Sequence, residues 1–164
     1  MPNIIRFLGI DYGTKRIGIS HGDTELGIAM PLPMILNDGY RSLCKDLRHV
    51  FLSHPWDVFV VGYPLRMNGS VGSKAKEVDA FITHLGQEFV LPVIRSDETL
   101  TSEEALHRFK NNRKMRPRDV AHWKRFRQTG KIDSGAAVLI LQDYLNTLMR
   151  CDPNVIPNNV DDTD

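Results

Sequence analysis

The sequence contains few cysteines and has almost no net charge. The first observation argues against a disulfide-rich protein, and the second gives no sign of a strongly basic nucleic-acid-binding protein. Of its 164 residues only two are cysteines, Cys44 and Cys151, and neither stands in a C-x-x-C or metal-type spacing. We therefore expect free thiols in a reducing compartment rather than a disulfide framework. The formal net charge of +1 does not by itself indicate a nucleic-acid-binding protein.

Other signals are missing as well. No apolar run is long enough to cross a membrane, and residues 1–11 lack the layout of an export signal, so we expect a cytoplasmic protein with no membrane partner. The six histidines show no zinc-type spacing, and no catalytic serine or cysteine motif is evident. Because 41% of the residues are hydrophobic, the chain can form one domain with a sizeable core.

The hydrophobic pattern predicts three consecutive strands and then an alternation of helices and strands. Strands are expected at residues 4–10, 15–20, 26–36, 57–62 and 92–96, and helices at residues 40–52, 78–89, from Thr101 onward and 134–148. Pro31 and Pro33 place the third strand at a sheet edge, because proline removes ladder donors. This order implies an α/β domain, a mixed sheet flanked by helices, over residues 1–150. Residues 151–164 are rich in Pro, Asn and Asp and are expected to form a disordered tail.

Three carboxylates stand where predicted elements end or begin. Asp11 ends the first strand, Glu98 follows Asp97 at the end of the last strand, and Asp133 stands at the start of the last helix. Each has an ordinary interpretation: an aspartate that starts a turn, a solvated acidic pair near a helix N-terminus, and a helix N-cap. Taken singly, none of them indicates a site.

Together the three carboxylates predict a divalent-metal site. Two strand ends and one helix start that are distant in sequence can converge at one edge of a mixed sheet. Carboxylates held together there would repel one another unless cations lay between them. Mg²⁺ or Mn²⁺ is the natural partner, since hard cations prefer oxygen ligands. Two such ions about 4 Å apart can bind the attacking water and the leaving oxygen of a phosphodiester, without a protein nucleophile.

Four segments carry a family resemblance in their order and spacing. They are LGIDYGTKRIGI at residues 8–19, VVGYPLRMNGS at 60–70, DETLTS at 97–102 and KIDSGAA at 131–137. Together they resemble the YqgF-type family of Holliday-junction-resolvase-like proteins, also described as pre-16S rRNA nucleases, over residues 4–148. The resemblance implies a ribonuclease-H-like fold with a mixed five-stranded sheet flanked by helices. It also implies a divalent-metal endonuclease with metal-binding catalytic roles at Asp11, Glu98 and Asp133.

The resemblance implies a role in ribosome biogenesis. The family is linked to 5′ maturation of precursor 16S rRNA, so we expect the substrate to be that RNA or a ribosomal particle. A Holliday junction resolvase acting on four-way DNA is the alternative, and a monomer and a homodimer both stay open. The chain departs from the family pattern at Thr99, where arginine is usual, and at Gly135, where a bulkier residue is common. The segment before Lys131 is also longer than usual, and the loss of the arginine affects phosphate contacts expected near Glu98.

Basic residues are concentrated in one segment. Residues 108–131 hold ten Lys or Arg, opposed only by Asp119, and such an excess binds phosphates without reading sequence. A solvated loop is the competing interpretation, and Trp123 and Phe126 could either stack on unpaired bases or anchor the segment to the core. The candidate nucleic-acid contacts are Lys15, Arg16, Asn68, Arg113, Lys114, Arg116, Lys124, Arg125, Arg127 and Lys131.

Two other functions fit parts of the pattern. The segment GIDYGT at residues 9–14 also resembles the first phosphate loop of the actin and sugar-kinase superfamily. Those proteins close two such domains on ATP, and 164 residues supply one. A non-catalytic nucleic-acid-binding module in translation or transcription would not need the carboxylates, so their presence at all three positions argues against it.

Overall fold

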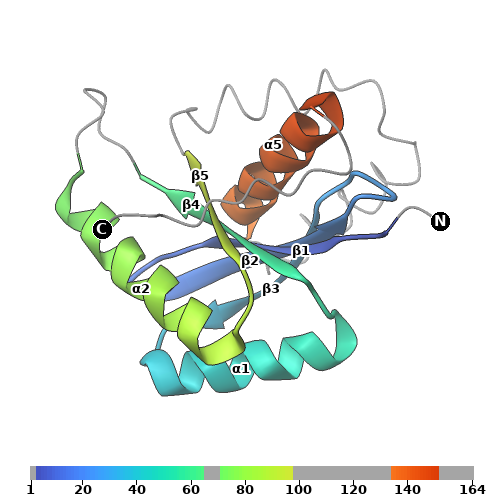
Figure 1. Cartoon of the computed structure of the whole chain (residues 1–164). Coiled ribbons are helices and arrows are strands. Elements are labelled where there is room, and N and C mark those ends of the chain that lie inside the picture. Colours follow the sequence, from blue (N-terminus) through green and yellow to red (C-terminus); the bar gives the residue numbers. More distant parts are fainter. Residues whose placement is uncertain (1–2, 65–70, 98–133, 152–164) are drawn as a thin grey trace.

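A computed structural model describes residues 3–64, 71–97 and 134–151 of the chain (Figure 1). The elements within these ranges alternate largely as the hydrophobic pattern predicts. In chain order they are β1 (Arg6–Asp11), β2 (Arg16–Asp23), β3 (Met30–Leu36), α1 (Tyr40–Ser53), β4 (Val58–Tyr63), α2 (Ser73–Phe89), β5 (Val93–Asp97) and α5 (Gly135–Cys151).

The strands form one five-stranded sheet in the order β3-β2-β1-β4-β5. The pairs β1–β2 and β2–β3 are antiparallel, whereas β1–β4 and β4–β5 are parallel. The predicted mixed sheet is therefore confirmed, and β3 with its two prolines lies at an edge as expected. Because β1, β3, β4 and β5 all run in one direction, their carboxyl ends meet at the same side of the sheet, which we call the carboxyl edge.

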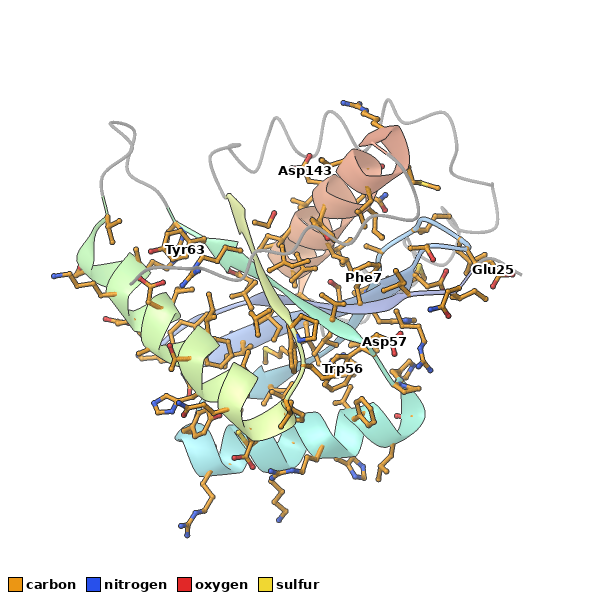
Figure 2. All side chains as sticks on the ribbon, in the orientation of Figure 1. Phe7, Glu25, Trp56, Asp57, Tyr63 and Asp143 are labelled. Carbon is orange, nitrogen blue, oxygen red and sulfur yellow. The ribbon has the colours of Figure 1, made fainter. Side chains whose placement is uncertain are left out.

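Helices cover both faces of the sheet: α1 and α2 lie on one face and α5 on the other (Figure 1). Alternation along β1 explains how one strand serves both layers, since successive side chains point to opposite faces. Leu8 and Ile10 belong to the core under α1 and α2, and Phe7 belongs to the core under α5. Figure 2 shows Phe7 on the α5 side of the sheet and Trp56 on the other side. Fully burying each such side chain stabilises the fold by about 1.5–3 kcal/mol.

The structure differs from the sequence-based expectation mainly at the ends of elements. Strand β2 continues to Asp23 rather than stopping at Ser20, because the backbone of residues 21–23 still pairs with β1. Helix α5 begins at Gly135 and runs to Cys151, three residues past the expected end. The Ser134 carbonyl accepts a hydrogen bond from the N–H of Val138, so Ser134 occupies the N-cap position of α5. The helix expected from Thr101 lies outside the described residues.

Gly9 lets α5 pack closely on β1. A Cβ at this position would lie 2.4 Å from Ser20 Oγ and 2.7 Å from Leu141 Cβ, both closer than non-bonded atoms approach. Ser20 Oγ itself donates a 2.8 Å hydrogen bond to the Ala137 carbonyl of α5. Glycine is therefore required here for space, and the contact fixes the distance between helix and sheet.

We predict that Gly9→Ala destabilises the fold by about 1–3 kcal/mol, because the added methyl overpacks the contact between β1 and α5. The control is Gly86→Ala in α2, where an added Cβ would meet nothing within 4 Å. That change is expected to raise the free energy of unfolding by up to about 1 kcal/mol through helix propensity. Urea unfolding of the two variants measures both effects, and a Gly9→Ala protein as stable as the unchanged one would contradict the account.

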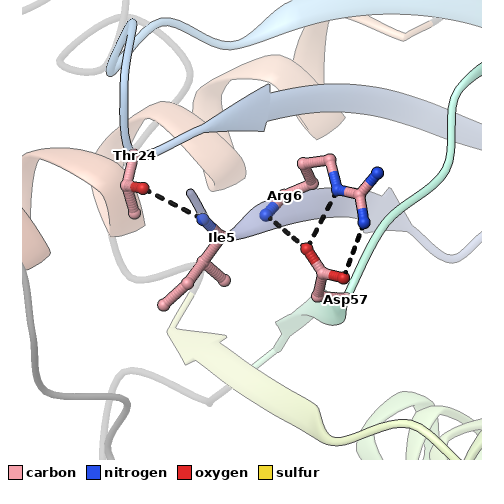
Figure 3. A network of polar contacts seen from close by, with 4 residues as sticks. All are labelled: Ile5, Arg6, Thr24 and Asp57. Atoms are coloured by element: carbon pink, nitrogen blue, oxygen red, sulfur yellow. Dashed lines mark hydrogen bonds and ion pairs between the residues drawn. The ribbon is translucent and has the colours of Figure 1, made fainter. Parts of the chain in front are cut away.

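The sheet end opposite the carboxyl edge is held by polar contacts (Figure 3). The guanidinium of Arg6 donates to both carboxylate oxygens of Asp57, with Nε–Oδ2 at 3.0 Å and Nη2–Oδ1 at 2.9 Å. The backbone N–H of Arg6 adds a third bond to Oδ2 at 2.9 Å. This bonding lowers the pKa of Asp57 and links the start of β1 to the residue before β4.

Two histidines also meet at this end of the sheet. The ring centroids of His21 on β2 and His54 at the end of α1 are 4.8 Å apart. Burial of the His21 ring and repulsion by His54 lower the pKa of His21 below its usual 6.5, despite the opposing effect of Asp23. The neutral imidazole is therefore favoured in the folded state.

We predict that this histidine makes the protein less stable in acid. Because the folded-state pKa is below 6.5, its contribution is fully present above pH 6.5 and is lost as the pH falls below that value. His21→Gln should flatten the decline of the melting temperature in that window. His49→Gln, which removes an exposed imidazole of α1, should leave the decline unchanged, and an identical decline in both variants would contradict the prediction.

Candidate functional site

Asp11 is the last residue of β1 and lies at the carboxyl edge, half-buried. Leu8 and Ile10 point toward α1 and α2, so strand alternation directs Asp11 toward α5, as it does Gly9. Among the described residues its carboxylate has no hydrogen-bond or ion-pair partner. An aspartate that merely started the turn would accept a bond from a backbone N–H nearby. Asp11 accepts no such bond from the described residues, so with respect to them its carboxylate oxygens are available to a ligand.

The sheet leaves space beside this carboxylate. On one side the register partner of Asp11 is Gly18 of β2. On the other side Ile10 pairs with Val61, so the residue of β4 that follows this pair is Gly62. Neither glycine has a side chain that could cover the carboxylate.

The end of β5 lies on the same face. Gly62 pairs with Ser96, and Ile94 belongs to the core under α5, so alternation places Ser96 on the α5 side. Asp11 and Ser96 thus flank Gly62, two strand spacings or roughly 10 Å apart. Glu98 comes two residues after Ser96 in the sequence and lies outside the described residues.

Ser134 fixes where α5 begins relative to the sheet. It is fully buried, and its hydroxyl lies between two register partners of β2 and β3. The Oγ accepts a 3.3 Å hydrogen bond from the N–H of Ile19 and donates a 2.7 Å bond to the carbonyl of Leu32. The pairing of β2 with β3 shifts register just before Ile19, and the hydroxyl bridges the two strands at that irregularity. The residue after Asp133 is thereby held next to β2, one position beyond the partner of Asp11.

The β1–β2 turn carries Lys15 and Arg16 at the same edge, and both are exposed. The turn is tight, since a Cβ on Gly13 would lie 2.3 Å from the carbonyl oxygen of Arg16. Asn37 anchors it from the end of β3: its Nδ2 donates to the Gly13 carbonyl at 3.0 Å, and its N–H donates to the Lys15 carbonyl at 2.9 Å. These contacts therefore fix the backbone of the turn to the end of β3.

Helices α1 and α2 begin at the carboxyl edge, because each follows a strand that ends there. Helix α5 begins close to this edge, because Ser134 is hydrogen-bonded to Ile19, the residue after the register partner of Asp11. None of the three has an acidic residue in its first turn. The N-cap residues of α1 and α2 are glycines without a side-chain cap. Arg41 and Lys74 are exposed in the first turns of α1 and α2. Helix N-termini favour negative charge, so this edge suits phosphates better than the opposite edge does.

Most of the predicted site lies outside the described residues. The structure describes Asp11, Lys15 and Arg16, and it places all three at the carboxyl edge. Within residues 3–64, 71–97 and 134–151 no group of three or more His, Cys, Asp or Glu could hold a metal ion. In the same ranges no helix combines the length and apolar character of a membrane span. The predicted residues outside these ranges are Glu98, Asp133, Asn68, Arg113, Lys114, Arg116, Lys124, Arg125, Arg127 and Lys131.

Two features of this edge were not predicted from the sequence. One is the Ser134 bridge, whose only local signal is a small hydroxyl residue before a helix. The other is a contact of Tyr63 and Arg95 with Asp79, which joins β4, β5 and α2. Both depend on strand register, which the local sequence does not reveal.

We predict that Ser134→Ala lowers the free energy of unfolding by about 1–3 kcal/mol, because it leaves a buried N–H of β2 and a buried carbonyl of β3 without the bridge. Thr147→Ala is a control on the same helix, since its exposed hydroxyl bonds only to the Asp143 carbonyl in the preceding turn. That change is expected to stay within about 0.5 kcal/mol. Equal effects in chemical denaturation would show that the bridge does not hold α5.

Comparison with known proteins identifies the family. The profile of the RuvX family, described as Holliday junction resolvase, matches residues 5–147. A protein of Opitutus terrae is 39% identical over 87% of this chain and 92% of its own length. One of a Geobacillus species is 40% identical over 87% of this chain and 99% of its own. Both carry the name "Putative pre-16S rRNA nuclease".

The chain therefore belongs to the RuvX family, whose members are nucleases acting on phosphodiester bonds. This confirms the resemblance drawn from the four motifs, which now rests on a match to most of the chain.

Solved structures confirm the ribonuclease-H-like fold. The fowlpox virus resolvase in complex with Holliday junction DNA matches with a TM-score of 0.54 at 13% identity, over 88% of this chain and 99% of the viral one. Thermus thermophilus RuvC in complex with a Holliday junction substrate matches with a TM-score of 0.50 at 11% identity, over 88% and 96% of the two chains. At these identities the likeness concerns the fold alone.

Proposed function

We propose that this protein is a divalent-metal-dependent endonuclease whose metal ligands are Asp11, Glu98 and Asp133. One observation carries the proposal: Asp11 is half-buried without a partner among the described residues, beside the start of α5 and on the face of the sheet to which β5 contributes Ser96. The other two carboxylates adjoin these two elements in the sequence. Asp133 directly precedes Ser134, and Glu98 directly follows the end of β5.

The donor set fits a hard divalent cation. Carboxylate oxygens are the ligands that Mg²⁺ and Mn²⁺ prefer. The glycines beside Asp11 leave its carboxylate open to an ion and to a phosphate group. When bound, Mg²⁺ would stabilise negative charge on a phosphodiester and favour deprotonation of water.

The remaining residues of the edge would hold the nucleic acid. Lys15 and Arg16 follow Asp11 closely in the sequence, in a turn whose backbone Asn37 anchors, so they bring positive charge to the same edge of the sheet. The uncapped N-termini of α1 and α2 favour phosphates further along the same edge. We propose that the basic segment 108–131 completes this surface, with contacts to phosphates that do not depend on base sequence.

We propose precursor 16S rRNA, free or in a ribosomal particle, as the substrate. The names of the relatives that match nearly their whole length support this choice. Four-way DNA is the second candidate, because the family profile carries the description of a Holliday junction resolvase.

A cleavage assay with 16S precursor RNA and a four-way DNA junction, run side by side with and without Mg²⁺, separates these candidates. We expect Mg²⁺-dependent cutting of the RNA. Cutting of the junction alone would replace the RNA by DNA as substrate. Cutting of neither, in the presence of ribosomal particles as well, would contradict the proposed activity.

We predict that Asp11→Asn, Glu98→Gln and Asp133→Asn each lower the cleavage rate by at least about 100-fold while the protein stays folded, because each removes a charged metal ligand. Asp38→Asn is the matched control, since Asp38 is an exposed carboxylate between β3 and α1 at the same edge. It should cut at the normal rate. A ligand variant with full activity would remove that residue from the site.

A further inference from the structure

The carboxyl ends of β4 and β5 are joined to α2 by three side chains. Tyr63, the last residue of β4, donates a 2.8 Å hydrogen bond from its hydroxyl to Asp79 Oδ2. Arg95 of β5 donates a 3.0 Å bond from Nη2 to Asp79 Oδ1, so the two partners use different oxygens of one carboxylate. The Arg95 guanidinium carbon also lies 5.5 Å from the centre of the Tyr63 ring. We call these residues the Tyr63–Asp79–Arg95 clamp.

The clamp lies at the edge where the metal site is proposed. Tyr63 is the register partner of Asp97, the last residue of β5, and Arg95 precedes Asp97 by two residues. Figure 2 shows Tyr63 near the first turns of α2, whereas Asp57 lies at the other end of β4. The next residue of the chain after β5 is Glu98. The clamp therefore holds the strand that directly precedes one of the proposed metal ligands in the sequence.

We propose that the Tyr63–Asp79–Arg95 clamp is a positioning device for metal binding: it fixes the end of β5, which directly precedes the proposed ligand Glu98 in the sequence. The inference rests on the proposed function. The clamp is on the α2 face of the sheet and Asp11 on the α5 face, so the clamp does not contact the ion and acts through the backbone of β5. Groups that orient metal ligands typically change metal affinity by about 10–100-fold when they are removed.

The chain contains a matched control for this inference. Arg6 and Asp57 form a similar arginine–aspartate pair on the same sheet, with comparable exposure of 48% and 41% against 36% and 37% in the clamp. That pair lies at the opposite end of the sheet. Removing either pair should cost comparable stability, and only the clamp should affect metal binding.

The test is Mn²⁺ binding to the full-length protein without nucleic acid, measured by titration calorimetry, for the unchanged protein, Asp79→Ala and Asp57→Ala. We expect Asp79→Ala to bind about ten-fold more weakly and Asp57→Ala to bind within two-fold of the unchanged protein. Asp79→Asn keeps an acceptor oxygen and should recover part of the loss. In cleavage assays, Asp79→Ala should need about ten-fold more Mg²⁺ for half-maximal rate, with an unchanged KM for the nucleic acid.

The outcomes separate the two proposals. Equal Mn²⁺ affinity in the Asp79 and Asp57 variants, with normal binding by the unchanged protein, would overturn the clamp and leave the proposed function intact. Absence of Mn²⁺ binding in the unchanged protein would overturn both. If Asp79→Ala does not fold, Asp79→Asn with normal affinity and normal Mg²⁺ requirement would overturn the clamp.

Discussion

The position at which α5 packs on the sheet is the constraint on which the proposed site depends. Gly9 allows the helix to approach β1 closely. The hydroxyl of Ser134, inserted between backbone groups of β2 and β3, sets the position at which the helix begins. A helix free to slide along the sheet would move Ser134, the residue that follows the proposed ligand Asp133 in the sequence, relative to β1 and β2. Backbone pairing and one buried hydroxyl thus bring together residues that are more than a hundred positions apart in the sequence.

The fold was largely predictable from the sequence because its signals are local. The apolar runs of β1 and β4, the prolines of β3 and the helical stripe that includes Val78 and Phe81 each depend on a few neighbouring residues. The ends of elements were less predictable. Strand β2 continues through residues 21–23, which are not hydrophobic, because β1 still supplies backbone partners, and a hydrophobic pattern does not reveal such pairing.

The candidate site was predictable only in part. Asp11 is preceded by a buried strand and followed by a glycine turn, so its place at the end of a strand, at the carboxyl edge, could be predicted from the local pattern. Ser134 and the Tyr63–Asp79–Arg95 clamp did not, because their partners are set by register and, for Ser134 and Ile19, are 115 residues apart. In the sequence, Ser134 has the pattern of an ordinary helix cap and Asp79 that of a surface residue. Their contacts with the strands become visible only once the register of the strands is known. The two ends of the sheet then differ: one is held by the pairing of Arg6 with Asp57, and the other combines a half-buried carboxylate with three helix N-termini.

The most direct test of the account is the position of a bound metal. A crystal of the full-length protein soaked in Mn²⁺ would locate the ion by its anomalous scattering. We predict a peak in contact with the carboxylate of Asp11, between the end of β1 and the start of α5. A peak at the His21–His54 pair alone, or no peak near Asp11 at saturating Mn²⁺, would contradict it.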